Sequence, residues 1–147
     1  MALSDREILI EMERKRLIIV PFTKLKITPA GYDLSSQSEV ELKPKEQRLL
    51  TTLESVELCD DILATIHLKS SLCREGLIGS FAVVDPGFRG KLTLSLFNAG
   101  LASVHIDKEE PIIQMIFYRT GEPSINPYKG KYQDSSGVVE SRRKIGR

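Results

Sequence analysis

The sequence has few of the side chains that hold structural metals or form disulfides. It contains 2 cysteines and 2 histidines in 147 residues. Cys59 and Cys73 form no CxxC pair, and His67 and His105 do not flank them at a metal-ligand spacing. We therefore expect no structural zinc site. Two lone thiols are typical of a cytoplasmic protein, and we expect both of them to pack in apolar surroundings.

Net charge and long apolar runs are also lacking. Lys plus Arg total 21 and Asp plus Glu total 20, so the formal net charge is +1. Binding of nucleic acid through bulk charge needs a basic surface, which excludes nucleic acid as an expected partner. The longest apolar runs, such as 17–20 and 81–84, are far too short to cross a bilayer, and the first residues lack the pattern of a signal peptide. The composition predicts a soluble cytoplasmic protein without a membrane partner.

The chain has the composition of one globular domain followed by a different tail. Hydrophobic residues make up 41% and charged residues 28% of the sequence, and we expect a single domain over 1–130. From 131 to 147 the segment has two acidic residues and five basic ones, which are Lys131, Arg142, Arg143, Lys144 and Arg147. We predict a basic flap that orders over an anionic ligand, and the alternative is a solvated, mobile terminus.

Hydrophobic periodicity predicts a short helix followed by many strands. Ser4 and Glu7 fit a capping box, and apolar residues recur on one face over 5–15, so we expect a helix there. Strand-type runs separated by Pro and Gly turns occupy 17–20, 62–68, 92–97 and 112–118. This pattern predicts a mainly β fold, either a sandwich or a barrel of the jelly-roll type.

Three segments place polar side chains where scaffold residues alone are not expected. Pro29 and Gly31 shape an irregular backbone just before Asp33, whose simpler explanation is a turn or cap residue. Asp85 closes an apolar strand before a Pro-Gly turn, which suits a general base, although an Asp at that place also initiates turns.

The remaining segment, 69–76, follows a strand and precedes a short helical turn. Lys69, Ser70 and Ser71 offer a cation, hydroxyls and free N–H groups, which together form an anion site. Simple helix capping by a serine is the alternative. The sequence contains no Walker A motif, no Rossmann fingerprint and no zinc-deaminase signature.

Taken in order, these segments resemble the trimeric dUTPase and dCTP deaminase superfamily over nearly the whole chain. Lys69 stands where arginine is usual in dUTPases. The stretches that resemble the first four dUTPase motifs are 30–34, 69–71, 83–90 and 111–116. The opening 3–8 and the closing 127–133 look like the deaminase branch, and the combination is most similar to the short archaeal dUTPases. The resemblance implies a distorted β-barrel with jelly-roll character, a β-clip, that forms homotrimers with three active sites at subunit interfaces.

One position separates the two branches. The deaminases carry a catalytic glutamate in the strand after the third motif, and Ser95 stands at that place. A serine hydroxyl does not act unaided as the base that activates water. Two features point the other way, because the Gly-rich C-terminal motif of dUTPases is missing and Arg74 matches an arginine of the deaminase motif. The resemblance favours hydrolysis of dUTP to dUMP and pyrophosphate. The alternatives are a dCTP deaminase, alone or bifunctional, and a nucleotide-binding regulatory protein without catalysis.

The resemblance also implies a role for each site residue on a deoxynucleoside triphosphate. Asp85 would hold the deoxyribose 3′-hydroxyl and activate the attacking water, which Gln114 would help to position. Asp33 would bind Mg²⁺ through the water shell of the metal. Phe88 would stack under the deoxyribose, and Thr93 would pair with the uracil edge. Contacts to the phosphates and from the tail are expected from Lys69, Ser70, Ser71, Arg74, Tyr128, Lys131 and Gln133.

Overall fold

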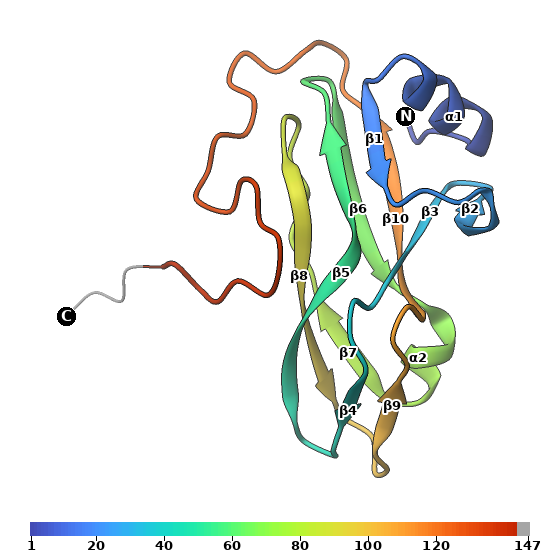
Figure 1. Ribbon diagram of the computed structural model, residues 1–147, viewed down its shortest axis with the longest axis vertical. Coiled ribbons are helices and arrows are strands. Elements are labelled where there is room, and N and C mark those ends of the chain that lie inside the picture. The colour runs from blue at the N-terminus through green and yellow to red at the C-terminus, as the bar shows by residue number, and fades with distance from the viewer. Residues whose placement is uncertain (144–147) are drawn as a thin grey trace.

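The chain folds almost entirely into antiparallel β-structure in the computed structural model, which describes residues 1–143 (Figure 1). The first sheet has the strand order β1 (Leu17–Val20), β5 (Gln47–Leu58), β8 (Arg89–Asn98) and β7 (Leu77–Ser80). The second has the order β2 (Ile27–Thr28), β3 (Gly31–Ser35), β10 (Pro111–Arg119) and β6 (Ile62–Leu68). A small two-stranded sheet pairs β4 (Val40–Leu42) with β9 (Val104–Ile106). The mainly β prediction is confirmed, but the described strands form open sheets rather than a closed barrel.

Three short helical elements accompany the sheets: α1 (Asp5–Glu13), the 3-10 turn η1 (Lys24–Lys26) and α2 (Ser70–Arg74). The predicted capping box is confirmed, because the Ser4 hydroxyl accepts from Glu7 N–H while the Glu7 carboxylate accepts from Ser4 N–H. Helix α1 ends two residues before the predicted end, since Lys15 adopts a left-handed φ of 56°. No helix within residues 1–143 is long and apolar enough to cross a membrane.

Strand β8 has two chemically different faces. Leu92, Leu94 and Leu96 are buried in the core between the sheets, whereas the alternating Thr93 and Ser95 are only half-buried. Side chains of a strand point alternately to opposite faces, so the apolar core side fixes which residues of β8 face away from it. The alternation predicted at 92–97 is confirmed, and it turns two hydroxyl side chains toward the site described below.

The C-terminal segment, residues 127–143, returns to lie along β8 (Figure 1). Lys91 N–H donates to the Ser135 carbonyl at 2.7 Å, and Asp134 N–H donates to the Arg89 carbonyl at 2.8 Å. Gly90 has a φ of 140°, and a Cβ there would lie 2.8 Å from Ser135 N, so only glycine permits this approach. Of the predicted basic residues in this tail, Lys144 and Arg147 lie outside the described residues. The boundary at residue 130 and the flap role stay predictions.

Candidate active site

A cavity of about 630 Å³ opens between the outer face of β8, segment 81–88 and the C-terminal segment. Four of the site residues predicted from the sequence line it, namely Asp85, Phe88, Thr93 and Tyr128. The rings of Phe88 and Tyr128 lie 5.7 Å apart, centre to centre, and form part of one aromatic wall. The cavity has the size and the mixed apolar and polar lining of a small-molecule site.

The loop that carries Asp85 is tied to the C-terminal segment. Tyr128 N–H donates to the Pro86 carbonyl at 2.7 Å. Gly87 has a φ of 85°, and a Cβ there would lie 2.7 Å from Cβ of Pro127. Gln133 clamps the same loop, because its Nε2 donates to the Gly87 carbonyl at 2.8 Å while its Oε1 accepts from a backbone N–H of Arg89 at 2.9 Å. The C-terminal segment therefore forms one wall of the cavity in its own chain.

Two predicted tail contacts do not reach the cavity in this structure. The side-chain amide of Gln133 bonds to the loop that carries Asp85. Lys131 is exposed, and its Nζ donates to the Arg142 carbonyl at 3.1 Å. Thr93 does line the cavity, but its hydroxyl accepts from Val139 N–H at 3.0 Å. The tail thus already uses one acceptor position of the Thr93 hydroxyl, which was expected to pair with the uracil edge.

Three other predicted residues, Asp33, Lys69 and Gln114, lie on or next to the other sheet, where Thr28 joins them; we call these four residues the Asp33 cluster. Lys69 Nζ lies 2.5 Å from Oδ2 of Asp33, and Gln114 stands directly opposite Asp33 across β3 and β10. Gln114 Nε2 donates to the Thr28 hydroxyl at 2.6 Å, and its Oε1 is an acceptor that can bind a water. These four residues do not line the cavity that holds Asp85.

The predicted phosphate-binding residues continue from this cluster. Helix α2 begins directly after Lys69, and its exposed residues include Ser70, Ser71 and Arg74. Within residues 1–143, Oδ1 of Asp33 is buried and has no hydrogen-bond partner. A buried carboxylate oxygen without a hydrogen-bond donor can bind a cation or a water molecule of its hydration shell. Asp33 therefore fits the Mg²⁺ role that the resemblance implies.

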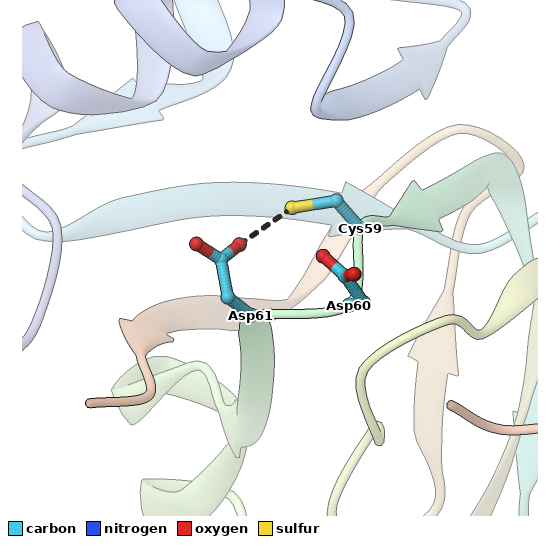
Figure 2. A group of neighbouring side chains, drawn as sticks. All are labelled: Cys59, Asp60 and Asp61. Atoms are coloured by element: carbon cyan, nitrogen blue, oxygen red, sulfur yellow. Dashed lines mark hydrogen bonds between the residues drawn. The ribbon is translucent and has the colours of Figure 1, made fainter. Parts of the chain in front are cut away.

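A third polar group, shown in Figure 2, joins Cys59, Asp60 and Asp61, whose ligand atoms all lie within 4.8 Å of one another. The thiol of Cys59 donates to Oδ1 of Asp61 at 2.9 Å, and Arg16 contacts the same carboxylate at 2.5 Å. Burial raises the pKa of the Cys59 thiol to about 11, so the thiol is protonated at neutral pH. The Asp61 carboxylate forms ion pairs with Arg16 and Arg119, so it belongs to an ion-pair cluster.

The expected burial of both thiols is only half right. Cys59 packs against the core, whereas Cys73 is exposed on α2. In a five-residue helix with only Leu72 buried, the neighbouring side chain turns to solvent.

Several cavity residues were not singled out from the sequence. These residues are Gln47, Ser80, Lys91 and Tyr132, which line the cavity beside the already discussed Ser95. Gln47 Nε2 donates to the Ser95 hydroxyl at 2.9 Å. The strand alternation gave a signal for Ser95, but no sequence pattern brings Gln47, 48 residues away, to its side.

Residues 35–120 of this chain, more than half of its length, match the dCTP deaminase-like family. The chain belongs to this family. A dCTP deaminase of Thermococcus kodakarensis is 44% identical over 146 residues, which cover 89% of this chain and 94% of that protein. A probable deoxyuridine 5′-triphosphate nucleotidohydrolase of Sulfolobus islandicus rod-shaped virus 1 is 35% identical over 154 residues, which cover 95% of this chain and 97% of the viral protein.

Solved structures of dUTPases share the fold of this family member. The EIAV dUTPase superposes with a TM-score of 0.62 at 17% identity, covering 78% of this chain and 98% of that one. The dUTPase of phage phi11 of S. aureus, described with a structural Mg(II) ion, also gives 0.62 at 17% identity, covering 78% and 97%. The superfamily expected from the sequence is confirmed. The names of the relatives divide between deamination and hydrolysis, so membership alone does not fix the reaction.

Proposed function

We propose that the protein is a dUTP diphosphatase, which hydrolyses dUTP to dUMP and pyrophosphate. The observation that carries this proposal is the chemistry of the cavity wall. Within the described residues, Asp85 is the only carboxylate that lines the cavity, and Ser95 stands where a deaminase carries its glutamate. Hydrolysis needs one group that orients water, whereas deamination also needs a group that delivers protons to the leaving amine. The viral relative and the dUTPase structures support the same reading.

Asp85 acts on the attacking water in this proposal. Its carboxylate is exposed at the cavity, next to the buried ring of Phe88. The loop clamp from the C-terminal segment holds both side chains on a fixed backbone, so little reorganisation is needed before reaction. Phe88 offers an apolar surface to the deoxyribose, and the carboxylate accepts a proton from water in line with the phosphate.

The Asp33 cluster and helix α2 bind the phosphates in this proposal. Lys69 supplies a cation, and Ser70, Ser71 and Arg74 add exposed donors on the turn that follows it. Asp33 would hold Mg²⁺ through the free oxygen described above. When bound, the metal supplies neutralisation of the charge that develops on the leaving pyrophosphate. Gln114, oriented by Thr28, presents a carbonyl oxygen beside Asp33 that accepts a hydrogen bond from a water.

Because the Asp33 cluster and the Asp85 cavity are separate in one chain, we propose that the working enzyme is a homotrimer with sites between subunits. The cluster of one subunit then completes the cavity of another. Two inactive variants test this arrangement when they are mixed by co-expression. Asp33→Asn and Asp85→Asn subunits together should regain activity, to about a quarter of the parental value if subunits mix at random. A mixture as inactive as its parents would contradict shared sites.

A dCTP deaminase is the second candidate, and the names of the archaeal relatives favour it. A nucleotide-binding protein without catalysis is the third. Separate incubations with dUTP and dCTP in the presence of Mg²⁺, followed by product identification, distinguish the three. We expect dUMP and pyrophosphate from dUTP, and from dCTP no ammonia and only much slower hydrolysis. Ammonia release from dCTP would establish deamination, and tight binding of dUTP without pyrophosphate release would establish a binding protein.

A further inference from the structure

Gln47 and Ser95 form a polar pair in the wall of the cavity. Gln47 begins β5 and Ser95 lies in β8, and Nε2 of Gln47 donates to Oγ of Ser95 at 2.9 Å. The residues paired with Ser95 in the neighbouring strands are Leu49 and Ser80, and both line the same cavity. The cavity wall here is therefore neutral and partly apolar, and its polar side chains are the Gln47–Ser95 pair and Ser80.

The direction of this hydrogen bond sets what Ser95 offers to a ligand. A serine hydroxyl has one proton to donate and two lone pairs that accept. Because one lone pair already accepts from Gln47, the hydroxyl proton is free to donate into the cavity. An amide that donates to a hydroxyl also polarises it and makes it a better donor. The pair consequently presents a donor to whatever lies in front of Ser95.

Ser95 and the residues of the sugar site share one cavity. Segment 81–88 follows Ser80, which pairs with Ser95, and brings Asp85 and Phe88 to the cavity that Thr93 and Ser95 also line. With the sugar at Asp85 and Phe88, we place the base in the part of the cavity that Thr93 and Ser95 line.

We infer that the Gln47–Ser95 pair reads the 4-position of the pyrimidine and selects a 4-oxo base over a 4-amino base. This inference rests on the proposed function. A carbonyl oxygen at that position accepts the Ser95 proton, whereas an amino group there meets a second donor. Sites that hydrogen-bond one functional group reject an analogue that leaves them unpaired. The pair thus acts as a specificity determinant, and no reacting atom touches it.

Reversal of the hydrogen bond tests the inference. Gln47→Glu keeps the side-chain shape but turns the donor into an acceptor, so Ser95 must donate to it and present a lone pair to the base. We expect the ratio of kcat/KM for hydrolysis of dUTP to that of dCTP to fall at least tenfold. Ser95→Ala, which removes the donor altogether, should lower the ratio about as much. The ratio of the Kd values for dUMP and dCMP, measured by calorimetry, should change in the same direction.

Gln37→Glu is the matched control. Oε1 of Gln37 accepts from Nζ of Lys91, another cavity residue, so this variant adds the same charge near the same cavity without touching Ser95. Its selectivity should stay within about twofold of the parental value. Unchanged selectivity in both Gln47→Glu and Ser95→Ala, with the parental melting temperature, would overturn the inference. If the parental protein hydrolyses neither triphosphate, the proposed function fails, and the monophosphate Kd ratios still decide the inference.

Discussion

Two polar clusters of this protein each hold a buried carboxylate and differ in how completely that carboxylate is hydrogen-bonded. One is the Glu11 cluster, defined here as Glu11, Arg16, Asp61 and Arg119; the other is the Asp33 cluster. Glu11 is 1% exposed, and its two oxygens accept from Arg16 at 2.8 Å and Arg119 at 3.0 Å. Oδ2 of Asp33 accepts from Lys69 Nζ, whereas Oδ1 is buried and has no hydrogen-bond partner within the described residues.

The difference separates a structural role from a functional one. In the Glu11 cluster burial alone would raise the pKa of the Glu11 carboxyl, but the hydrogen bonds from Arg119 and Arg16 outweigh it and hold the pKa below its usual value. That cluster ties α1 to β10 and to the turn before β6. An unpaired buried oxygen costs stability, and a protein retains it where a ligand supplies the missing partner.

The largest effect should come from the cavity carboxylate. Asp85→Asn keeps the side-chain shape but removes the base, so we expect kcat for dUTP to fall about 1,000-fold with nucleotide binding retained. Pyrophosphate release measures turnover, and calorimetry with dUMP measures binding. Asp60→Asn, which neutralises an exposed aspartate outside the cavity, should have parental kinetics. Parental turnover in Asp85→Asn would exclude the assigned role.

Asp33→Asn should give the next largest change in activity and almost none in stability. We expect kcat to fall about 100-fold because a preorganised charge at the phosphates is lost. The Mg²⁺ concentration that gives half-maximal activity should rise. The free energy of unfolding should change by less than about 1 kcal/mol, since the ion pair that is lost involves the partly exposed Lys69 and the free oxygen has no partner to lose. A large loss of stability with full activity would show that the Asp33 cluster stabilises the fold and does not act on the substrate.

Glu11→Gln should show the opposite pattern. It leaves Arg16 and Arg119 without their buried counter-charge, and we expect a loss of about 2 kcal/mol in the free energy of unfolding, moderated by the partial exposure of both arginines. Urea denaturation measures this loss. Glu13→Gln, at an exposed position of the same helix, is the control and should be neutral. The activity per folded molecule should stay parental, and a specific loss of kcat would refute a purely structural cluster.

The smallest effect should be a pH dependence of stability that the Glu11 cluster produces. The carboxyl groups of Glu11 and Asp61 both have a pKa below the usual range, Asp61 because the Cys59 hydrogen bond and the arginine charges outweigh its burial. A carboxylate with a lowered pKa stabilises the fold above about pH 5, and this stabilisation is lost as the pH falls. Urea unfolding between pH 7 and pH 3 should show a shallower decline in Glu11→Gln than in the parental protein. Parallel declines would mean that other carboxylates carry the effect.

Local patterns in the sequence predicted much of the fold. The capping box fixed the start of α1, and the alternation along 92–97 fixed which side of β8 is apolar. Both succeed because they depend on neighbouring residues, whose periodicity is visible without knowledge of the rest of the chain. The sequence did not decide whether the sheets close into a barrel, since closure depends on pairing between strands that are distant in the sequence.

The candidate site was only partly predictable. Twelve residues were expected to converge, but the structure divides them between the Asp85 cavity, the Asp33 cluster and the C-terminal segment. The sequence alone determined which site residues are present. It contains the motifs of the family in their usual order, a serine in place of a glutamate at position 95, and glycines at 87 and 90. Only the tertiary structure decided that Gln47 meets Ser95, that Gln133 holds the loop, and that Asp33 keeps an unpaired oxygen. Such contacts arise from long-range strand pairing and packing, which no local pattern of residues encodes.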